Sequence, residues 1–157
     1  MKIHRVLLLL CLALIAFTAS AKDFSFTDTK GNPQNLVDYR GQWVLVNFWA
    51  TWCPPCRQET PDLVALHNEH KLAVIGVALD SQRPAVEAFM TKYAVSYPIV
   101  IGSYTMAEYQ VGKVDALPTS YLYDPTGQLV SFQEGMLTRD EIETYIMLKT
   151  KHSGDKK

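Results

Sequence analysis

The sequence predicts a single α/β domain in which a mixed β-sheet carries helices on both faces. Apolar runs of strand length alternate with segments whose apolar residues recur at helical spacing. The 157 residues suit one domain, and no repeat, linker or low-complexity run divides them before the polar tail at 149–157. Two cysteines, Cys53 and Cys56, fall where the first central strand should meet a helix.

Each element has its own local signal. Trp43–Trp49 is apolar, β-branched and aromatic, as a central strand requires, and Leu72–Leu79 is apolar almost throughout, as in a parallel strand buried on both faces. Pro84 suits the first turn of a helix. The remaining elements expected before the last third of the chain are a strand and turn at Phe24–Gly31, helices at Cys56–His70 and Pro84–Tyr93, a strand at Tyr97–Ile101 and a helical turn at Thr105–Tyr109.

The last third of the chain predicts a hairpin followed by a helix. Strands at Thr119–Tyr123 and Leu129–Gln133 are joined by Asp124-Pro-Thr-Gly127, whose proline and glycine favour a turn. The final helix begins at Thr138, because Thr138 and Glu141 have the spacing of a capping box. We expect its core face to carry Ile142, Tyr145, Ile146 and Leu148.

The N-terminus predicts an exported protein with a periplasmic or other extracytoplasmic location. Residues 1–21 combine Lys2 and Arg5, an apolar run and a small-x-small ending at Ala21, which is typical of a cleaved signal peptide, so the mature domain spans 22–157. The alternative, a retained anchor, has only 16 residues from Val6 to Ala21 against the roughly 20 that cross a bilayer. Lipidation of Cys11 is disfavoured by the bulky leucines before it.

The charge balance argues against polyanionic partners. The formal net charge is −1, and it becomes −3 once residues 1–21 are removed, because Lys2 and Arg5 go with them. This gives no electrostatic reason to expect nucleic acid or an anionic membrane as a partner. We expect a monomer.

Cys53 and Cys56 predict thiol-disulfide chemistry. A bridge over so short a loop constrains the unfolded chain little, so a purely structural disulfide is the weaker interpretation. Cys53 at the start of a helix is the expected exposed nucleophile, because free N–H groups and the helix dipole favour a thiolate there, and Cys56 is the expected, more buried, resolving thiol. Pro54 and Pro55 have no N–H, which leaves the Cys56 amide as the nearest donor to Cys53. The redox-active Cys53–Cys56 disulfide needs no added cofactor.

The chain resembles the TlpA/ResA-type thioredoxin-like thiol-disulfide reductases over residues 24–148. The resemblance rests on Asn47–Pro61, Ala116-Leu-Pro-Thr119, the Asp124–Gly127 turn and the extra element at Phe24–Gly31, in this order and spacing. It implies a thioredoxin fold, disulfide-containing exported client proteins and electrons from a membrane donor of the DsbD/CcdA kind. Members serve cytochrome c maturation, copper-centre assembly or general reduction, and no residue here selects among these.

The same resemblance implies roles for residues around the cysteines. Pro118 should be cis and lie against the disulfide, while the Leu117 backbone pairs with an extended client segment. Trp52 should line the surface that receives the client, and Trp43 and Trp49 should be core. Pro118 as an ordinary trans residue and Trp52 as a core residue are the alternatives.

Asn47 replaces the acidic residue that relays a proton in cytosolic thioredoxins. We expect a buried amide satisfied by backbone there. Asp80 or Glu59 could supply the missing carboxylate, and the resemblance implies a functional carboxylate near Asp80. The alternative interpretations are a helix cap for Asp80, and for Glu59 a solvent-facing side chain or a pair with Arg57.

Four other functions compete with disulfide reduction. No zinc site is expected, because His67 lies about 16 Å along the helix from Cys56, and His67 and His70 should be surface residues. A Cu(I) carrier or metallochaperone would use Cys53 and Cys56 as soft ligands but lacks an evident third. A peroxiredoxin-like peroxidase requires a threonine farther upstream of the cysteine than Thr51 lies. A strong oxidase has a large helical insertion, which this sequence lacks between Leu79 and Pro118.

Overall fold

A five-stranded mixed sheet forms the centre of the protein. The computed structural model describes residues 23–79 and 82–154. The strands lie in the order β5-β4-β3-β6-β7, with β3, β4 and β5 parallel and β6 and β7 antiparallel to their neighbours. Their bounds are β3 Val44–Trp49, β4 Ala73–Ala78, β5 Ile99–Ile101, β6 Thr119–Tyr123 and β7 Leu129–Glu134. The mixed sheet expected from the sequence is confirmed.

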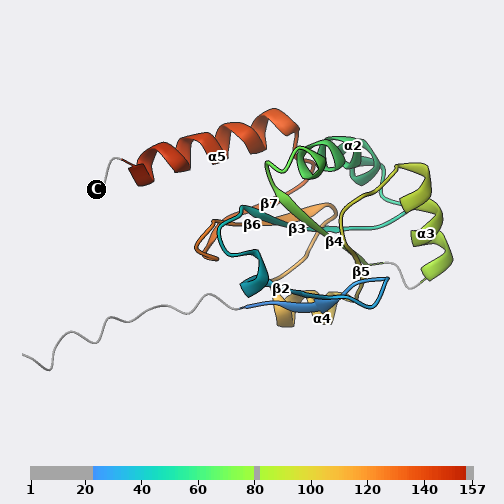
Figure 1. Ribbon diagram of the computed structural model, residues 1–157. Coiled ribbons are helices and arrows are strands. Elements are labelled where there is room, and N and C mark those ends of the chain that lie inside the picture. Colours follow the sequence, from blue (N-terminus) through green and yellow to red (C-terminus); the bar gives the residue numbers. More distant parts are fainter. Residues whose placement is uncertain (1–22, 80–81, 155–157) are drawn as a thin grey trace, which may run out of the picture.

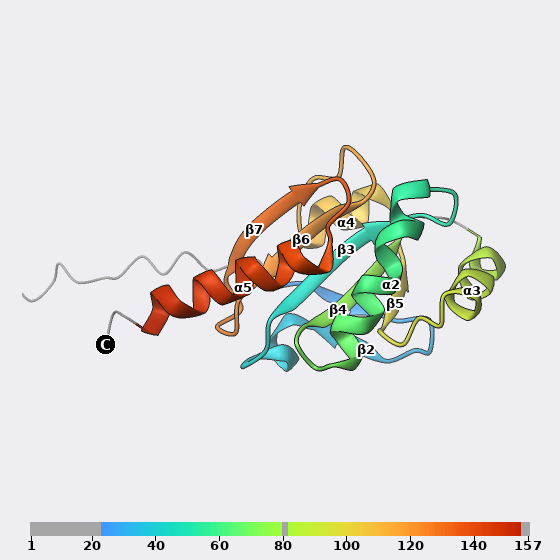
Figure 2. The same ribbon diagram turned by 90° about the horizontal axis from the view of Figure 1, so that it is seen from above.

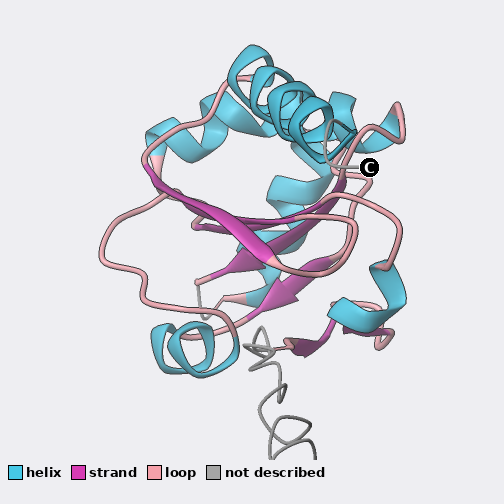
Figure 3. Cartoon of the chain, turned by 90° about the vertical axis from the view of Figure 1, so that its left-hand side faces the viewer, coloured by secondary structure: helices cyan, strands magenta, loops and turns pink. Residues whose placement is uncertain are grey.

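Helices cover both faces of this sheet, as predicted (Figures 1 and 3). The four α-helices of the described chain are α2 Pro54–Asn68, α3 Arg83–Lys92, α4 Tyr104–Gln110 and α5 Arg139–Gly154. Leu63 of α2, Phe89 of α3 and Ile142 of α5 belong to one apolar cluster, which also contains both cysteines. Ala107 of α4 belongs to a second cluster on the opposite face.

The N-terminal extension is a hairpin rather than a single strand and turn. Strands β1 Ser25–Thr27 and β2 Pro33–Asn35 pair antiparallel and lead into a 3-10 helix, η1 Leu36–Tyr39. The second apolar cluster contains buried Phe24, Phe26 and Leu36. Asp28 holds the turn together by accepting N–H groups of Lys30 and Asn32 at 2.9 and 2.8 Å. The extension therefore completes the core on the α4 side.

Capping residues set where helices α2 and α5 begin. Helix α2 begins at Pro54, two residues earlier than expected, because the Cys53 side chain acts as its N-cap and proline suits a first turn. At α5 the capping box is confirmed: the Thr138 N–H donates to Glu141 Oε2 at 2.8 Å. Leu148 was expected in the core but is 51% exposed. The C-terminal part of α5 extends past the sheet (Figures 1 and 2).

Contacts at its beginning attach α5 to the rest of the domain. The Arg139 guanidinium donates to both carboxylate oxygens of Glu69 at 2.8 and 2.6 Å, and Tyr145 donates its hydroxyl to the Val130 carbonyl at 2.6 Å. These contacts position the loop before α5, which matters for the site below. Across residues 23–79 and 82–154, no helix has the length and apolar character of a membrane span.

Gly76 in β4 predicts a stability effect. A Cβ there would lie 2.6 Å from Ile99 Cδ1 and 3.0 Å from Trp49 Nε1, both in packed side chains. We expect Gly76→Ala to lower the free energy of unfolding by about 1–3 kcal/mol through overpacking. Gly102→Ala is the matched control, because the nearest atom there is the flexible end of Met106. Urea unfolding of both variants measures the difference, and an equal cost would contradict this packing account.

Candidate active site

The two cysteines form a disulfide at the start of α2, where β3 ends. The Cys53 N–H donates to the Ala50 carbonyl at 3.2 Å, so the chain turns sharply between strand and helix. The Cys56 N–H donates to Cys53 Sγ at 3.3 Å, which confirms the donor expected from the two intervening prolines. The strand-to-helix turn therefore holds the first sulfur over the helix N-terminus.

Both cysteines are buried in this disulfide form. Cys53 is 2% exposed and Cys56 is 1% exposed, so the expectation of an exposed Cys53 is wrong for this state. The reason is packing: Ala50, Trp49 and Leu117 contribute to the same apolar cluster around the bridge. The helix N-terminus still distinguishes the two sulfurs, because only Cys53 is the capping residue.

The chain before β6 reaches the same edge of the sheet as the cysteines. The Leu117–Pro118 bond is cis, as predicted. Phe48 pairs with Thr119 in the antiparallel register, which places Pro118 opposite the end of β3. Pro118 is buried, and its carbonyl accepts the Gly135 N–H at 2.8 Å. Leu117 is partly buried and contacts both apolar clusters.

The three tryptophans divide between surface and core. Trp52 is 63% exposed directly before Cys53, which excludes the core alternative. Trp49 is 3% exposed, and Trp43 is partly buried against the α2 side of the core, as expected. An exposed indole beside a buried disulfide leaves apolar area where a client would approach.

Glu59 is a buried, hydrogen-bonded carboxylate on α2. It lies three residues after Cys56, on the same side of α2, and is only 2% exposed. Asn47 donates its side-chain amide to Glu59 Oε1 at 2.7 Å, and the Leu137 backbone N–H donates to Oε2 at 3.1 Å. The interpretation that Glu59 faces solvent or pairs with Arg57 is therefore wrong.

The same contacts correct the expectation for Asn47. Its amide is satisfied by side chains rather than backbone, since it donates to Ser120 Oγ at 3.1 Å as well as to Glu59. Asn47 and Ser120 are direct neighbours in the β3–β6 register. Asn47 thus holds the buried carboxylate in place instead of replacing it. Asp80, the other candidate, lies outside the described residues.

Burial dominates the acid–base behaviour of Glu59. Loss of water around the carboxylate raises its pKa to about 7, while the hydrogen bonds from Leu137 and Asn47 oppose the rise. A carboxyl with a pKa near neutrality can both accept and return a proton under physiological conditions. Glu59 lies three residues after Cys56 on α2.

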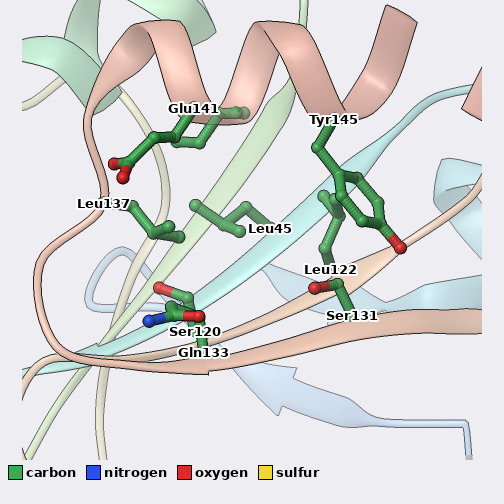
Figure 4. A pocket seen from close by; sticks show the side chains of 9 residues that line it. Leu45, Ser120, Leu122, Ser131, Gln133, Leu137, Glu141 and Tyr145 are labelled. Carbon is green, nitrogen blue, oxygen red and sulfur yellow. The ribbon is translucent and has the colours of Figure 1, made fainter. Parts of the chain in front are cut away.

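A cavity of about 220 Å³ lies between α5 and the β6–β7 hairpin (Figure 4). Its lining includes the apolar residues Leu45, Leu122 and Ile142 and the polar side chains of Ser131 and Gln133. Ser120 and Leu137 also line it, and they are the residues that hold Asn47 and Glu59. The cavity is therefore adjacent to the residues that hold the Glu59 carboxylate in place, and the two cysteines do not line it.

His67 lies near the end of α2, and His70 is an exposed residue after the helix, as expected. His67 is half-buried, and its Nδ1 accepts the Val74 N–H at 3.2 Å, so it is a structural residue rather than the surface residue expected. Burial lowers the pKa of His67. In the part of the chain that the structure describes, no group of three or more His, Cys, Asp or Glu side chains could hold a metal ion.

Sequence reasoning missed Ser120 and the loop between β7 and α5. Gly135 contacts Pro118 and Leu137 contacts Glu59, both through backbone N–H groups, so no side-chain pattern marks them. Ser120 carried a usable signal: it lies two residues after Pro118, in a strand expected beside the one that contains Asn47.

The chain is similar in sequence to known thiol-disulfide oxidoreductases and thioredoxin-like proteins. The chain is 34% identical over 137 residues to thiol-disulfide oxidoreductase ResA of Geobacillus kaustophilus, covering 84% of this chain and 77% of that protein. It is 39% identical over 129 residues to thioredoxin-like protein YneN of Bacillus subtilis, covering 78% and 74%.

The fold and family agree as well. A thiol:disulfide interchange protein of Chlorobium tepidum matches with a TM-score of 0.71 and 27% identity, covering 82% of this chain and 93% of that one. The model of the AhpC/TSA family matches residues 18–132. With a disulfide at the N-terminus of α2 and a buried carboxylate one turn beyond it, the chain belongs to this thioredoxin-like family and is a thiol-disulfide oxidoreductase.

Proposed function

We propose that the protein is an exported reductase of disulfides in client proteins, with Glu59 as the proton acceptor for Cys56. The observation that carries the proposal is the buried Glu59 carboxylate, one turn after Cys56, with a pKa raised to about 7. A carboxylate in this state can take the thiol proton when the resolving step begins.

The reaction proceeds by two exchanges. The Cys53 thiolate attacks one sulfur of the client disulfide, the client S–S bond breaks, and the departing client thiolate takes a proton from solvent. Glu59 then accepts the Cys56 proton, and the Cys56 thiolate attacks Cys53 Sγ. The mixed disulfide breaks, the departing second client thiolate takes the proton held by Glu59, the client leaves with both cysteines reduced, and the enzyme keeps the Cys53–Cys56 disulfide.

A donor must return two electrons to that disulfide after each turnover. The proposed donor is a membrane thiol reductase of the DsbD/CcdA kind, which the resemblance to TlpA/ResA-type proteins implies. Export rests on residues 1–21, which have the pattern of a signal peptide and lie outside the described residues. Related structures from Mycobacterium tuberculosis and Corynebacterium glutamicum are described as secreted, which supports the same location.

The direction of electron flow can be measured as a reduction potential. Pro54 and Pro55 supply neither N–H groups nor charge, so the Cys53 thiolate has one close backbone donor and the dithiol is not strongly stabilised. We expect a potential nearer to thioredoxin's roughly −270 mV than to the roughly −120 mV of a strong oxidant. Equilibration with thiol–disulfide buffers gives the value.

Pro55→His is the matched variant for this measurement. It places a partly cationic side chain between the cysteines and should raise the potential, because reduced Cys53 would then be stabilised. A wild-type potential above about −150 mV would overturn the reductase assignment in favour of an oxidase. Rapid turnover of peroxide by the wild type would instead favour a peroxidase.

A further inference from the structure

Arg57 is fixed beside the disulfide. Its backbone N–H donates to the Cys53 carbonyl at 3.3 Å, and its side-chain Nε donates to the Thr51 carbonyl at 2.8 Å. The side chain therefore folds back over the turn that carries Trp52 and Cys53. One N–H of the planar guanidinium is used in this anchor, and the two terminal nitrogens keep their fork of donors.

The charge of Arg57 has no carboxylate partner within residues 23–79 and 82–154. Lys113, five residues before Pro118, is by contrast held by Asp115 at 2.7 Å. Glu59, which could have neutralised Arg57, is turned inward to Asn47 and Leu137. The guanidinium thus presents positive charge on the exposed surface next to the thiols.

Trp52 directly follows Thr51, whose carbonyl accepts the Arg57 Nε–H, and it is 63% exposed. Tryptophan and arginine are the side chains most enriched among the residues that carry binding energy at protein interfaces. A fixed guanidinium binds a carboxylate through two parallel hydrogen bonds, and less side-chain entropy is lost because the anchor to Thr51 already orients it.

We propose that Arg57 and Trp52 select client segments that carry a carboxylate side chain next to the reactive cysteine. This specificity rests on the proposed function, since it acts on the same disulfide exchange. Arg57 binds the carboxylate, Trp52 covers apolar atoms of the same segment, and together they direct the client sulfur toward Cys53.

Two synthetic peptides test the proposal. Both are closed by one intramolecular disulfide and differ only in having Asp or Asn beside one cysteine. We expect the wild type to reduce the Asp peptide with a kcat/KM about 3- to 10-fold higher, the size of a partly exposed charged contact. The preference should disappear in Arg57→Gln, reverse in Arg57→Glu and persist in Lys113→Gln, the control for a charge lost elsewhere on the surface.

The ratio of the two peptides separates recognition from chemistry. A change in thiol pKa or potential caused by Arg57→Gln affects both peptides equally, because both meet the same dithiol. Equal turnover of the two peptides by the wild type, or an Asp preference that survives in Arg57→Gln, would overturn the inference while leaving disulfide reduction intact. Reduction of neither peptide would overturn the proposed function and this inference with it.

Discussion

Replacing Cys53 with alanine should reduce client disulfide reduction to the uncatalysed background, whereas replacing Cys56 with serine should trap the client on the enzyme. Cys53 is the helix-capping sulfur and receives the Cys56 N–H at 3.3 Å, so its thiolate is the stabilised one. Without Cys56 nothing resolves the mixed disulfide. Insulin reduction measures the first effect, and non-reducing electrophoresis with mass spectrometry identifies the trapped client in the second.

Cys53→Ser is the control for the trapping experiment, because it removes the attacking sulfur and should give no covalent complex. The captured protein would also name the pathway that the dithiol serves. A trapped complex on Cys56 in the Cys53→Ala variant would reverse the two roles and contradict the assignment made from the helix N-terminus.

Glu59 should make a contribution to the free energy of unfolding that decreases as the pH rises from about 4.5 to about 7. Burial raises the pKa of Glu59 to about 7 in the folded protein, against 4.5 for an ordinary glutamate, so the folded state keeps a proton that the unfolded chain releases. The stabilisation is complete below the lower value and is lost as pH passes through the upper one. The expected loss is about 3 kcal/mol.

Glu59→Gln should remove this part of the pH dependence, as seen in urea unfolding of the disulfide form at several pH values. The variant also loses one hydrogen bond, since the Asn47 amide and the Leu137 N–H both donate to the carboxylate and Gln offers only one acceptor. The slope against pH is therefore the test, not the absolute stability. Glu141→Gln is the control: hydrogen bonds from Thr138 lower the pKa of that carboxyl, so the decline between pH 4.5 and 7 should remain. A wild-type slope in Glu59→Gln would contradict the assignment.

Local rules predicted the parts of the site that depend on neighbours in sequence. The strand before Cys53, the helix after it and the Cys56 N–H donor follow from side-chain pattern and from the two prolines. The surroundings of Glu59 do not, because they depend on how distant segments meet. Asn47 lies opposite Ser120 only in one strand register, and Leu137 reaches Glu59 only because α5 is attached to α2 through Arg139 and Glu69.

Two predictions about the secondary-structure elements were wrong for similar reasons. Leu148 has the helical spacing of a core residue, but the sheet ends before it does. The sequence pattern predicted only a strand and turn where the structure has the hairpin β1–β2, because it does not show that this segment packs into the core on the α4 side. In each case the local pattern was interpreted correctly, but it does not say which distant segment lies beside the element in the fold.

The burial of the Cys53–Cys56 bridge limits the access of small thiols to the disulfide. With Cys53 2% and Cys56 1% exposed, a small thiol that collides with the surface reaches little of either sulfur. We therefore expect small thiols to reduce the bridge slowly, so that the oxidised form persists among them. Under the proposed function, a protein partner that docks over the site would gain access through contacts that a small thiol cannot make.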